Sequence, residues 1–166
     1  MSIKECVRCS AATKLGNQCK INTCKYSEFC WQHTKQLFDL GIKPSAIPNA
    51  GSGLFTYKEI PANKTICMYK GDILTRETYN ANNSGYGVSI SNGRVIDAKS
   101  TQSCLGRYAN NCRPVDKTAG ICNGNNAKFS IYQRAGRTTI RIKSTKRIPA
   151  NSEVYVSYGA GFWRGN

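Results

Sequence analysis

The stretches CLGRYANNCRP at residues 104–114 and EVYVSYG at residues 153–159 decide the fold of this chain. The second stretch predicts a short final strand over 154–158. Smaller islands accompany the two stretches in a fixed order along the chain. A lone Gly-x-Gly is most often an ordinary turn, so the order and spacing of the whole set carry the interpretation. The islands are GSGLF at 51–55, YGVSI at 86–90, VIDA at 95–98 and NAKF at 126–129.

Length and composition limit the possible functions. The 166 residues fit one ordinary domain plus a small appendage. Lys and Arg number 24 and Asp and Glu 9, which gives a net charge of +15. This charge predicts attraction to a polyanion such as nucleosomal DNA or another nucleic acid, and the alternative is a soluble basic protein whose lysines are simply solvated. The single His among nine Cys excludes His-rich metal catalysis and most catalytic triads.

Composition changes along the chain suggest its division into parts. Five of the nine cysteines fall within residues 6–30, and a segment rich in Gly, Pro and Ser follows at 41–53. Such a segment is typical of a connector. We therefore expect a Cys/His module at residues 1–40, a connector at 41–50 and a main domain at 51–166.

Short strands and turns dominate the pattern after the connector. The Asn-Gly at residues 92–93 predicts a tight hairpin turn, and Ala-Gly at 135–136 predicts another. Short helices are expected within 28–40, with Trp31, Leu37, Phe38 and Leu40 on one side, and at 76–81. The fold class is therefore mainly β, with several short sheets. The expected strands are 65–69, 86–90, 94–98, 129–133, 138–143 and 154–158.

The N-terminal cysteines suggest a metal site. Two pairs of candidate ligands, Cys6/Cys9 and Cys30/His33, have the two-residue gap that is common in zinc sites. A segment this short buries little core and needs a covalent or metal staple. Inside a cell a metal is favoured over disulfides. Zinc takes four ligands, so the residues alone leave open which four of six candidates bind it: Cys6, Cys9, Cys19, Cys24, Cys30 and His33.

The spacing of Cys9, Thr13, Gly16 and Cys19, followed by CWQH at 30–33, resembles a short zinc-binding module of giant-virus and protist proteins. The resemblance implies a structural zinc bound by Cys9, Cys19, Cys30 and His33. Cys6 and Cys24 would then displace one of these ligands, pair with each other or stay free.

The islands of the main domain, in their order, resemble the SET-domain protein-lysine methyltransferases, of a viral or protist type. Residues 107–112 resemble the RFINHSC segment of that family, and 153–158 resemble its ELxxDY segment. The resemblance covers roughly residues 45–163. It implies small antiparallel sheets and a C-terminal pseudoknot, in which the Asn110 stretch passes beneath the loop before the terminal Tyr.

Several positions depart from the family pattern. Asn111 stands where the family has His, Ser157 where it has Asp, and Val156 where an aromatic residue is common. Residues 115–125 form an insertion, and no Cys follows Cys122 to build the family's post-SET zinc site. These departures motivate an alternative, a catalytically inactive SET-like module that contains zinc and binds chromatin or nucleic acid. A third interpretation is a basic zinc-binding nucleic-acid protein without a cofactor.

The activity that the resemblance implies is S-adenosylmethionine-dependent lysine N-methylation, with a histone tail as the expected substrate. Displacement at a sulfonium methyl needs alignment and a neutral amine more than a strong acid or base, which suits a chain with one His. A lysine has a pKa of about 10.4, which a nearby positive charge and a dry aromatic channel both lower.

The same resemblance implies a role for each site residue. Tyr158 is the expected catalytic residue, and Tyr155 and Tyr69 are candidates for the wall of the substrate channel. Phe162 and Trp163 would close over the cofactor or the channel. The cofactor contacts it implies are Gly51, Gly53, Leu54, Tyr86, Asn110, Asn111, Tyr158 and Trp163.

Three further expectations complete the interpretation. Cys112 is expected to be a buried thiol, and Arg107 to pair structurally, for instance with Asp97.

No apolar run approaches the ~20 residues of a membrane helix, and the N-terminus lacks the apolar stretch of a signal peptide. We therefore expect a protein that binds no membrane and is not secreted, in the nucleus or cytoplasm, or in the host nucleus if it is viral.

Overall fold

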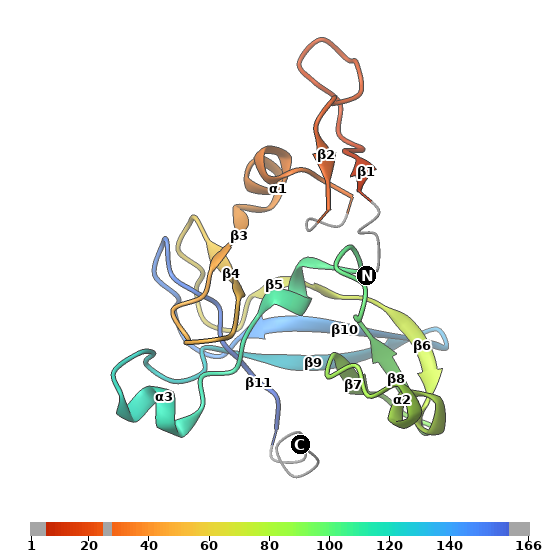
Figure 1. Ribbon diagram of the computed structural model, residues 1–166, viewed down its shortest axis with the longest axis vertical. Helices are drawn as coiled ribbons and strands as arrows, with labels where there is room; N and C mark the ends of the chain where they lie inside the picture. The colour runs from red at the N-terminus through yellow and green to blue at the C-terminus, as the bar shows by residue number, and fades with distance from the viewer. Residues whose placement is uncertain (1–5, 25–27, 160–166) are drawn as a thin grey trace.

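Short strands form most of the regular structure in the computed structural model, which describes residues 6–24 and 28–159 (Figure 1). The helices are α1 (Trp31–Phe38), α2 (Arg76–Asn82), α3 (Pro114–Thr118) and the 3-10 turn η1 (Leu105–Tyr108). The strands are β1 (Val7–Arg8), β2 (Asn22–Thr23), β3 (Leu40–Pro44), β4 (Ser52–Thr56), β5 (Thr65–Tyr69), β6 (Asp72–Thr75), β7 (Gly87–Ser89), β8 (Arg94–Asp97), β9 (Ala127–Arg134), β10 (Arg137–Ser144) and β11 (Val156–Ser157).

The strands form small, mainly antiparallel sheets, as expected. The largest has the order β11-β9-β10-β5, and a three-stranded sheet has the order β6-β8-β7. Two-stranded sheets pair β3 with β4 and β1 with β2. One face of the largest sheet lies on the main core, where Ile140 and Ile142 are fully buried and pack with Tyr69 and with Leu105 of η1.

Both predicted hairpins are confirmed. β7 pairs with β8, and β9 pairs with β10 in continuous antiparallel register. The turn residues Asn92 and Gly93 have φ of 61° and 65°, and Ala135 and Gly136 have φ of 48° and 73°. Two consecutive left-handed residues are the conformation of the tight turn that matches the twist of a hairpin.

The helix expected within 28–40 is α1, but its apolar residues do not form a core face. Trp31, Leu37 and Phe38 are 47–53% exposed, and Thr34 is the buried residue of the helix. The helix ends at Asp39, whose φ of 53° is left-handed. Leu40 is buried, but it belongs to the next strand.

The first four residues of the predicted connector at 41–50 belong to the strand β3. β3 pairs with β4 along its whole length, from Leu40 opposite Thr56 to Pro44 opposite Ser52. Only residues 45–51 form the loop between the two strands. The Gly and Pro content that suggested a linker therefore belongs to an edge strand and its turn.

The C-terminal segment is threaded through the main domain. The amide of Val156 donates to the Asn110 carbonyl (2.8 Å), and the amide of Ala127 donates to the Tyr155 carbonyl (2.9 Å). On a third side, the amide of Val154 donates to the Leu54 carbonyl (2.7 Å). The segment thus lies between the two ends of the loop that carries α3, as in the expected pseudoknot.

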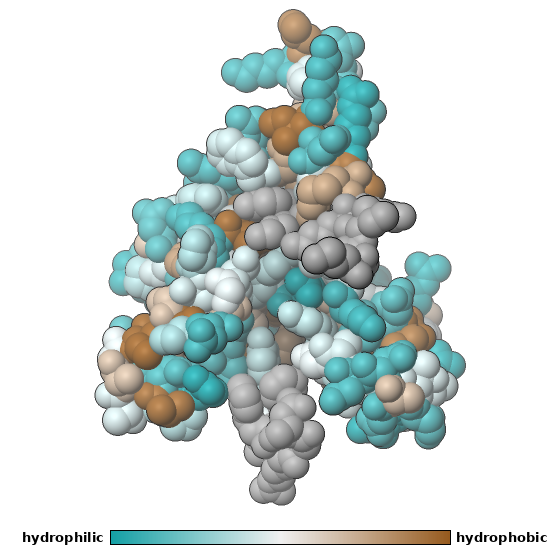
Figure 2. All heavy atoms as spheres, viewed as in Figure 1, coloured by the Kyte–Doolittle hydropathy of each residue, from teal (hydrophilic) through white to brown (hydrophobic). Residues whose placement is uncertain are grey.

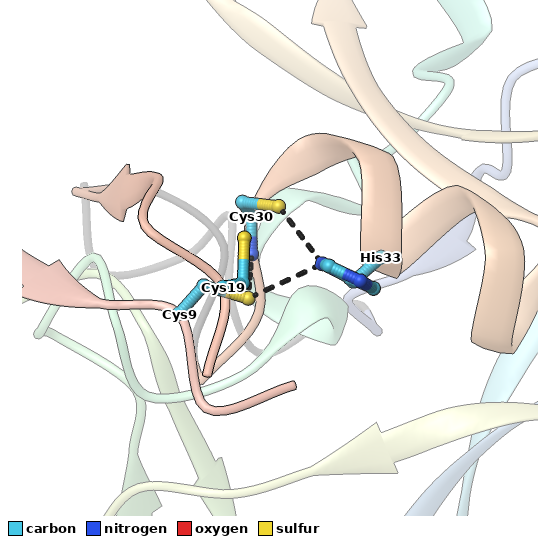
Figure 3. Close-up of side chains that lie close together, drawn as sticks. All are labelled: Cys9, Cys19, Cys30 and His33. Atoms are coloured by element: carbon cyan, nitrogen blue, oxygen red, sulfur yellow. Dashed lines mark hydrogen bonds between the residues drawn. The ribbon is translucent and has the colours of Figure 1, made fainter. Parts of the chain in front are cut away.

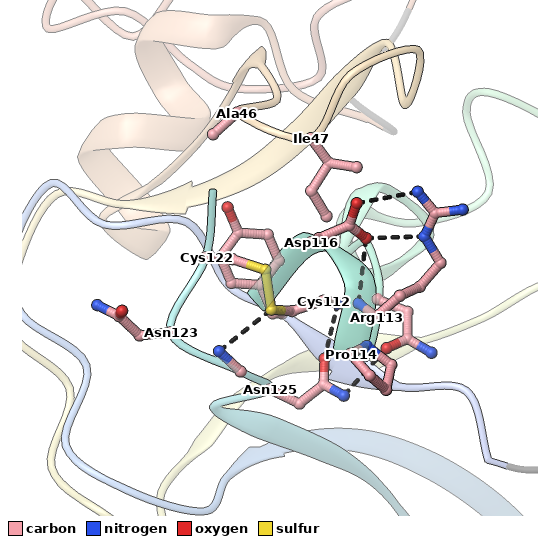
Figure 4. Close-up of a disulfide and its surroundings, with 12 residues drawn as sticks. Ala46, Ile47, Cys112, Arg113, Pro114, Asp116, Cys122, Asn123 and Asn125 are labelled. Carbon is pink, nitrogen blue, oxygen red and sulfur yellow. Dashed lines mark hydrogen bonds and ion pairs between the residues drawn. A yellow bond between two sulfur atoms is a disulfide. The ribbon is translucent and has the colours of Figure 1, made fainter. Parts of the chain in front are cut away.

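A disulfide closes the loop that carries α3 (Figure 4). Cys112 is bonded to Cys122, which corrects the expectation of a buried free thiol. The spacing of these cysteines gave no sign of pairing, because the turn through α3 brings them together. The disulfide packs against Ile47 and Tyr155 in a small second core. Hydrophobic residues are also exposed on the surface around α3 (Figure 2), where Val115 is 61% exposed.

The N-terminal module contacts the loop that follows β8. The hydroxyl of Thr101 donates to the Cys24 carbonyl (3.0 Å), and the amide of Gln102's side chain donates to the Thr23 carbonyl (3.4 Å). The hydroxyl of Tyr108 in η1 donates in turn to the Thr101 carbonyl (2.9 Å). The module is therefore linked to the centre of the main domain. None of the helices described is long and apolar enough to cross a bilayer.

Candidate active site and metal centre

Four side chains of the N-terminal module converge on one point (Figure 3). The ligand atoms of Cys9, Cys19, Cys30 and His33 all lie within 4.8 Å of one another. Cys30 and His33 come from the start of α1, while Cys9 follows β1 and Cys19 precedes β2. The three cysteines are at most 4% exposed.

The geometry of this cluster fits a tetrahedral zinc site. The Nδ1 atom of His33 lies 3.5 Å from the Cys9 sulfur and 3.3 Å from the Cys30 sulfur. Zinc bonds of about 2.3 Å to sulfur and about 2.0 Å to nitrogen place neighbouring ligand atoms roughly 3.5–3.8 Å apart. Cys6 and Cys24 form a disulfide with each other, so they leave the four expected ligands in place.

Tyr158 lies on a wall shared by two cavities of the main domain. It lines one cavity of about 480 Å³ and another of about 460 Å³. Its hydroxyl donates to the Ala109 carbonyl (2.9 Å). Burial, with repulsion from Tyr86, raises the pKa of Tyr158 to about 12, so the phenol is neutral at physiological pH.

The first of these cavities, here the Asn110 cavity, is lined mainly by polar groups. The side-chain nitrogen of Asn110 donates to the Ser52 carbonyl (3.1 Å) and to Oε1 of Glu153 (3.2 Å). Its Oδ1 has no hydrogen-bond partner within the described residues, which leaves it able to accept from an ammonium group of a ligand. The lining residues are Ala50, Ser52, Ser84, Gly85, Tyr86, Arg107, Tyr108, Asn110 and Tyr158.

Glu153 holds the side chain of Asn110 in place through a hydrogen bond, a role that the resemblance to the family did not imply. Its carboxylate is buried and accepts from the Ser45 hydroxyl (2.7 Å), the Ala46 amide (3.0 Å) and the Tyr155 hydroxyl (2.8 Å), besides Asn110. The available signal was a glutamate directly before an apolar strand pattern, because a carboxylate that is buried there needs several donors.

Gly53 is required by this carboxylate. A Cβ at Gly53 would lie 2.1 Å from Oε1 of Glu153. The protein's own carboxylate therefore occupies the space that a side chain at this glycine would need. Gly51, by contrast, has open space around it and a left-handed φ of 71°.

The other cavity, here the aromatic cavity, is bounded by four tyrosines and a phenylalanine. The rings of Tyr69 and Phe129 meet edge to face with centroids 5.0 Å apart, and the Tyr69 hydroxyl donates to the Tyr86 carbonyl (2.6 Å). Burial raises the pKa of Tyr69, so this hydroxyl also stays protonated. The aromatic lining residues are Tyr69, Tyr79, Tyr86, Phe129 and Tyr158.

Arg107 lines both cavities, but it does not pair with Asp97. Its guanidinium donates to the carbonyls of Ala98 (2.9 Å) and Lys99 (3.3 Å) and stacks 4.1 Å from the centre of the Tyr86 ring. Asp97 accepts from the Ser84 hydroxyl (2.6 Å) instead. The expectation of a structural role is thus met through backbone carbonyls of the residues that follow Asp97.

Some expected site residues lie away from the two cavities. Leu54 is fully buried in the main core, and Tyr155 is turned into the second core beside the disulfide. Asn111 accepts from the Asn125 side chain (3.0 Å) and lines a third cavity with Ser157. Phe162 and Trp163 lie outside the described residues. The structure therefore brings together Tyr69, Tyr86, Asn110 and Tyr158 of the expected set.

Comparison with known families matches residues 51–159 to the SET domain. Among solved structures, a humanized mutant of the Chaetomium thermophilum Polycomb Repressive Complex 2 bound to the inhibitor GSK343 aligns with a TM-score of 0.60 and 20% identity. Apo ctPRC2 with two mutations in Ezh2 aligns with a TM-score of 0.59 and 21% identity. Each alignment covers 72% of this chain and 15% of the other chain, so the present chain spans a small part of their length. No curated protein matches the chain.

Proposed function

Because the chain belongs to the SET-domain family, whose members are in general protein-lysine methyltransferases, we propose that it transfers a methyl group from S-adenosylmethionine to a protein lysine. The observation that carries this proposal is the position of Tyr158 between two cavities of different character. One cavity offers polar groups for a zwitterionic ligand, and the other offers aromatic walls for an aliphatic side chain.

The Asn110 cavity suits the methyl donor. Its volume of about 480 Å³ lies within the range of ordinary cofactor sites. Oδ1 of Asn110 would accept from the methionyl ammonium, and the guanidinium of Arg107 would attract the carboxylate. When bound, S-adenosylmethionine supplies an electrophilic methyl group on a sulfonium. Glu153 would keep the Asn110 amide oriented, since it fixes the nitrogen side of that group.

The aromatic cavity suits the acceptor lysine. The rings of Tyr69, Tyr86 and Phe129 would exclude water from its aliphatic stem and disfavour the ammonium form, which lowers the pKa of the amine. The neutral Tyr158 hydroxyl would contact the amine and align it for attack. We further propose a histone tail as the protein substrate, which would place the enzyme's action in the nucleus.

The cysteine cluster is proposed to bind one structural zinc. Cys9, Cys19, Cys30 and His33 would fill all four positions of a tetrahedral site, which leaves none for a reacting water. Its role would be to fold the N-terminal module, proposed at residues 1–40 ahead of a SET domain at 51–166. The module buries only a small cluster around the cysteines, so the metal would stabilise it in addition to the Cys6–Cys24 disulfide.

A methyl-transfer assay on core histones tests the activity. Tyr158→Phe is expected to lower kcat by roughly 10²–10³, because it removes one hydrogen-bonding group at the reacting atoms. Tyr57→Phe removes a hydroxyl outside both cavities and is expected to leave kcat unchanged. Transfer that survives Tyr158→Phe intact would contradict the assignment of Tyr158.

Calorimetry with S-adenosylmethionine separates an enzyme from an inactive module. Stoichiometric binding that weakens on Asn110→Ala is expected. Absence of binding, together with no methylated product across a broad panel of proteins, would favour the inactive chromatin-binding alternative.

A further inference from the structure

The largest sheet carries an unusual distribution of charge. Its four strands, β11, β9, β10 and β5, contain five basic residues and no acidic residue. The β9–β10 hairpin that holds them crosses the middle of the molecule (Figure 1). The basic residues are Lys128, Arg134, Arg137, Arg141 and Lys143.

All five lie on one face of the sheet. Side chains alternate between faces along a strand, and Ile140 and Ile142 of β10 point into the core. Arg137, Arg141 and Lys143 therefore point to the opposite face. The register places Lys128 opposite Lys143 and Arg134 opposite Arg137, so the two basic residues of β9 share that face. We call it the basic face.

The basic face carries repulsion that the described part of the protein does not neutralise. Two of its cross-strand pairs, Lys128/Lys143 and Arg134/Arg137, join like charges directly, an arrangement that destabilises a hairpin. The ion pairs among the described residues are made by other cations, namely Lys58, Arg113 and Arg147. The repulsion between these cations destabilises the free protein, and a bound polyanion would relieve it. Such an arrangement is typical of a binding surface.

We propose that the basic face binds the phosphate backbone of double-stranded DNA. Lys128 and Arg134 are six residues apart on one strand, so the cations span roughly 20 Å. Lys128 also pairs in register with Ser157, which precedes Tyr158, so the face reaches the C-terminal segment of the candidate site. Because Ser157 shares the face of Lys128, the next residue, Tyr158, points to the opposite side, where the cavities lie, so bound DNA would occupy the other face of the sheet from the candidate site.

The aromatic content of the face favours a duplex over other polyanions. Tyr132 is its aromatic residue, and the guanidinium of Arg141 covers the ring at 4.6 Å from its centroid. The ring is therefore not free to stack on the bases of a single strand. An anionic membrane is also disfavoured, because an interfacial surface presents Trp, Phe or Leu side chains beside its cations, and this face presents none.

Fluorescence anisotropy with a labelled random-sequence DNA duplex tests the proposal, using the full chain without cofactor. If all five cations contact phosphates, log K is expected to fall with log salt with a slope of about −4.5. The double variant Lys128→Gln/Arg137→Gln removes one member of each like-charged pair. It is expected to reduce the magnitude of the slope by about 1.8 and to keep or raise Tm, so that weaker binding cannot be attributed to unfolding.

Lys14→Gln/Lys99→Gln removes the same charge from exposed positions outside the sheet and is the matched control. Equal loss of binding in the two variants would overturn the proposal, because the net charge alone would then account for it. Tighter binding to phosphatidylserine vesicles or to single-stranded RNA than to the duplex would also overturn it. The inference concerns a partner of the proposed enzyme, and binding without cofactor decides it independently of methyl transfer.

Discussion

At the scale of single residues, Glu153 connects the backbone fold to the candidate site. Its carboxylate accepts four hydrogen bonds, from Ser45, Ala46, Asn110 and Tyr155, and it occupies the space that a side chain at Gly53 would need. A single group therefore holds the β3–β4 loop, the Asn110 amide and the C-terminal segment in one arrangement.

Glu153→Gln is expected to lower the free energy of unfolding by about 1–3 kcal/mol. The new NH₂ group would face groups that themselves donate hydrogen bonds, which leaves buried donors without an acceptor. The affinity for S-adenosylmethionine should fall as well, since the Asn110 amide loses its charged acceptor. Urea unfolding and calorimetry measure the two effects. Glu59→Gln is the matched control, because its carboxylate pairs with Arg147 at the surface and such pairs contribute little. Equal effects of the two substitutions would contradict the role of Glu153.

The raised pKa of Tyr158 predicts a stability change at high pH. Burial raises its pKa to about 12, whereas an unfolded tyrosine has a pKa of about 10. The native state keeps the proton that the unfolded chain loses, so this contribution to stability is complete below about pH 10 and is lost as the pH rises through about 12. Urea unfolding of the wild type and of Tyr158→Phe should therefore converge over this range. A difference that does not change with pH would refute the prediction.

The sequence was sufficient to predict the metal-ligand residues, whose chemistry is distinctive. It was not sufficient to predict which side chains of the expected motifs point into the candidate site. Cys9, Cys19, Cys30 and His33 meet as the resemblance to a zinc-binding module implies, whereas ligand spacing alone left six candidates. Tyr155 and Leu54 belong to the expected motifs but point into the two cores. The resemblance predicts where a residue lies along a strand. The packing of the neighbouring strands determines whether its side chain points into the core or into the candidate site.

At the scale of elements, the loop that carries α3 encloses the C-terminal segment. Val156 is held by Asn110 at one end of the loop, and Tyr155 is held by Ala127 at the other. Asn126 adds side-chain bonds to the Glu153 carbonyl (2.9 Å) and the Tyr155 amide (2.8 Å). The disulfide then restrains the loop from outside.

Removing this disulfide with Cys112→Ser/Cys122→Ser is expected to lower stability by about 2–3 kcal/mol, from the loop-closure entropy of the unfolded chain. Thermal unfolding should show a fall in Tm of roughly 5–10 °C. Cys67→Ser is the matched thiol control, because Cys67 is a free cysteine outside this loop. An unchanged Tm in the double variant would show that the bond does not restrain the loop.

Elements were predictable where local chemistry determines them. Asn-Gly and Ala-Gly turns fixed both hairpins, because their left-handed residues match the twist of paired strands. β3 was missed because its Gly41 and Pro44 resemble a linker, and its pairing with β4 is what orders it. The Cys112–Cys122 bond was missed for a similar reason, since it depends on how the inserted loop folds back.

At the scale of the whole molecule, the zinc module and the candidate site share a chain of contacts. Thr101 and Gln102 donate to the carbonyls of Cys24 and Thr23 in the module. Tyr108, which lines the Asn110 cavity, donates to the Thr101 carbonyl. Loss of the module's fold would therefore release one side of the loop that leads into η1.

Removal of the metal with a chelator is expected to unfold the module and to weaken S-adenosylmethionine binding. Hydrogen exchange should rise strongly across residues 6–24 and moderately across 98–110, while β9 and β10 keep their protection. Thr101→Ala, which leaves the proposed ligands in place, should reproduce part of the affinity loss in the zinc-bound protein. Full affinity after chelation, with the module shown to be unfolded, would contradict this coupling.

The position of the C-terminal segment also constrains how the protein is made. Ribosomes synthesise the chain from its N-terminus, so η1, the α3 loop and the β9–β10 hairpin emerge before the segment that lies between Asn110 and Ala127. A nascent chain stalled before β11 has the Asn110 side of the cavity but not Tyr158. The two halves of the candidate site can meet only after translation has passed residue 158, so neither half forms a working centre before that point.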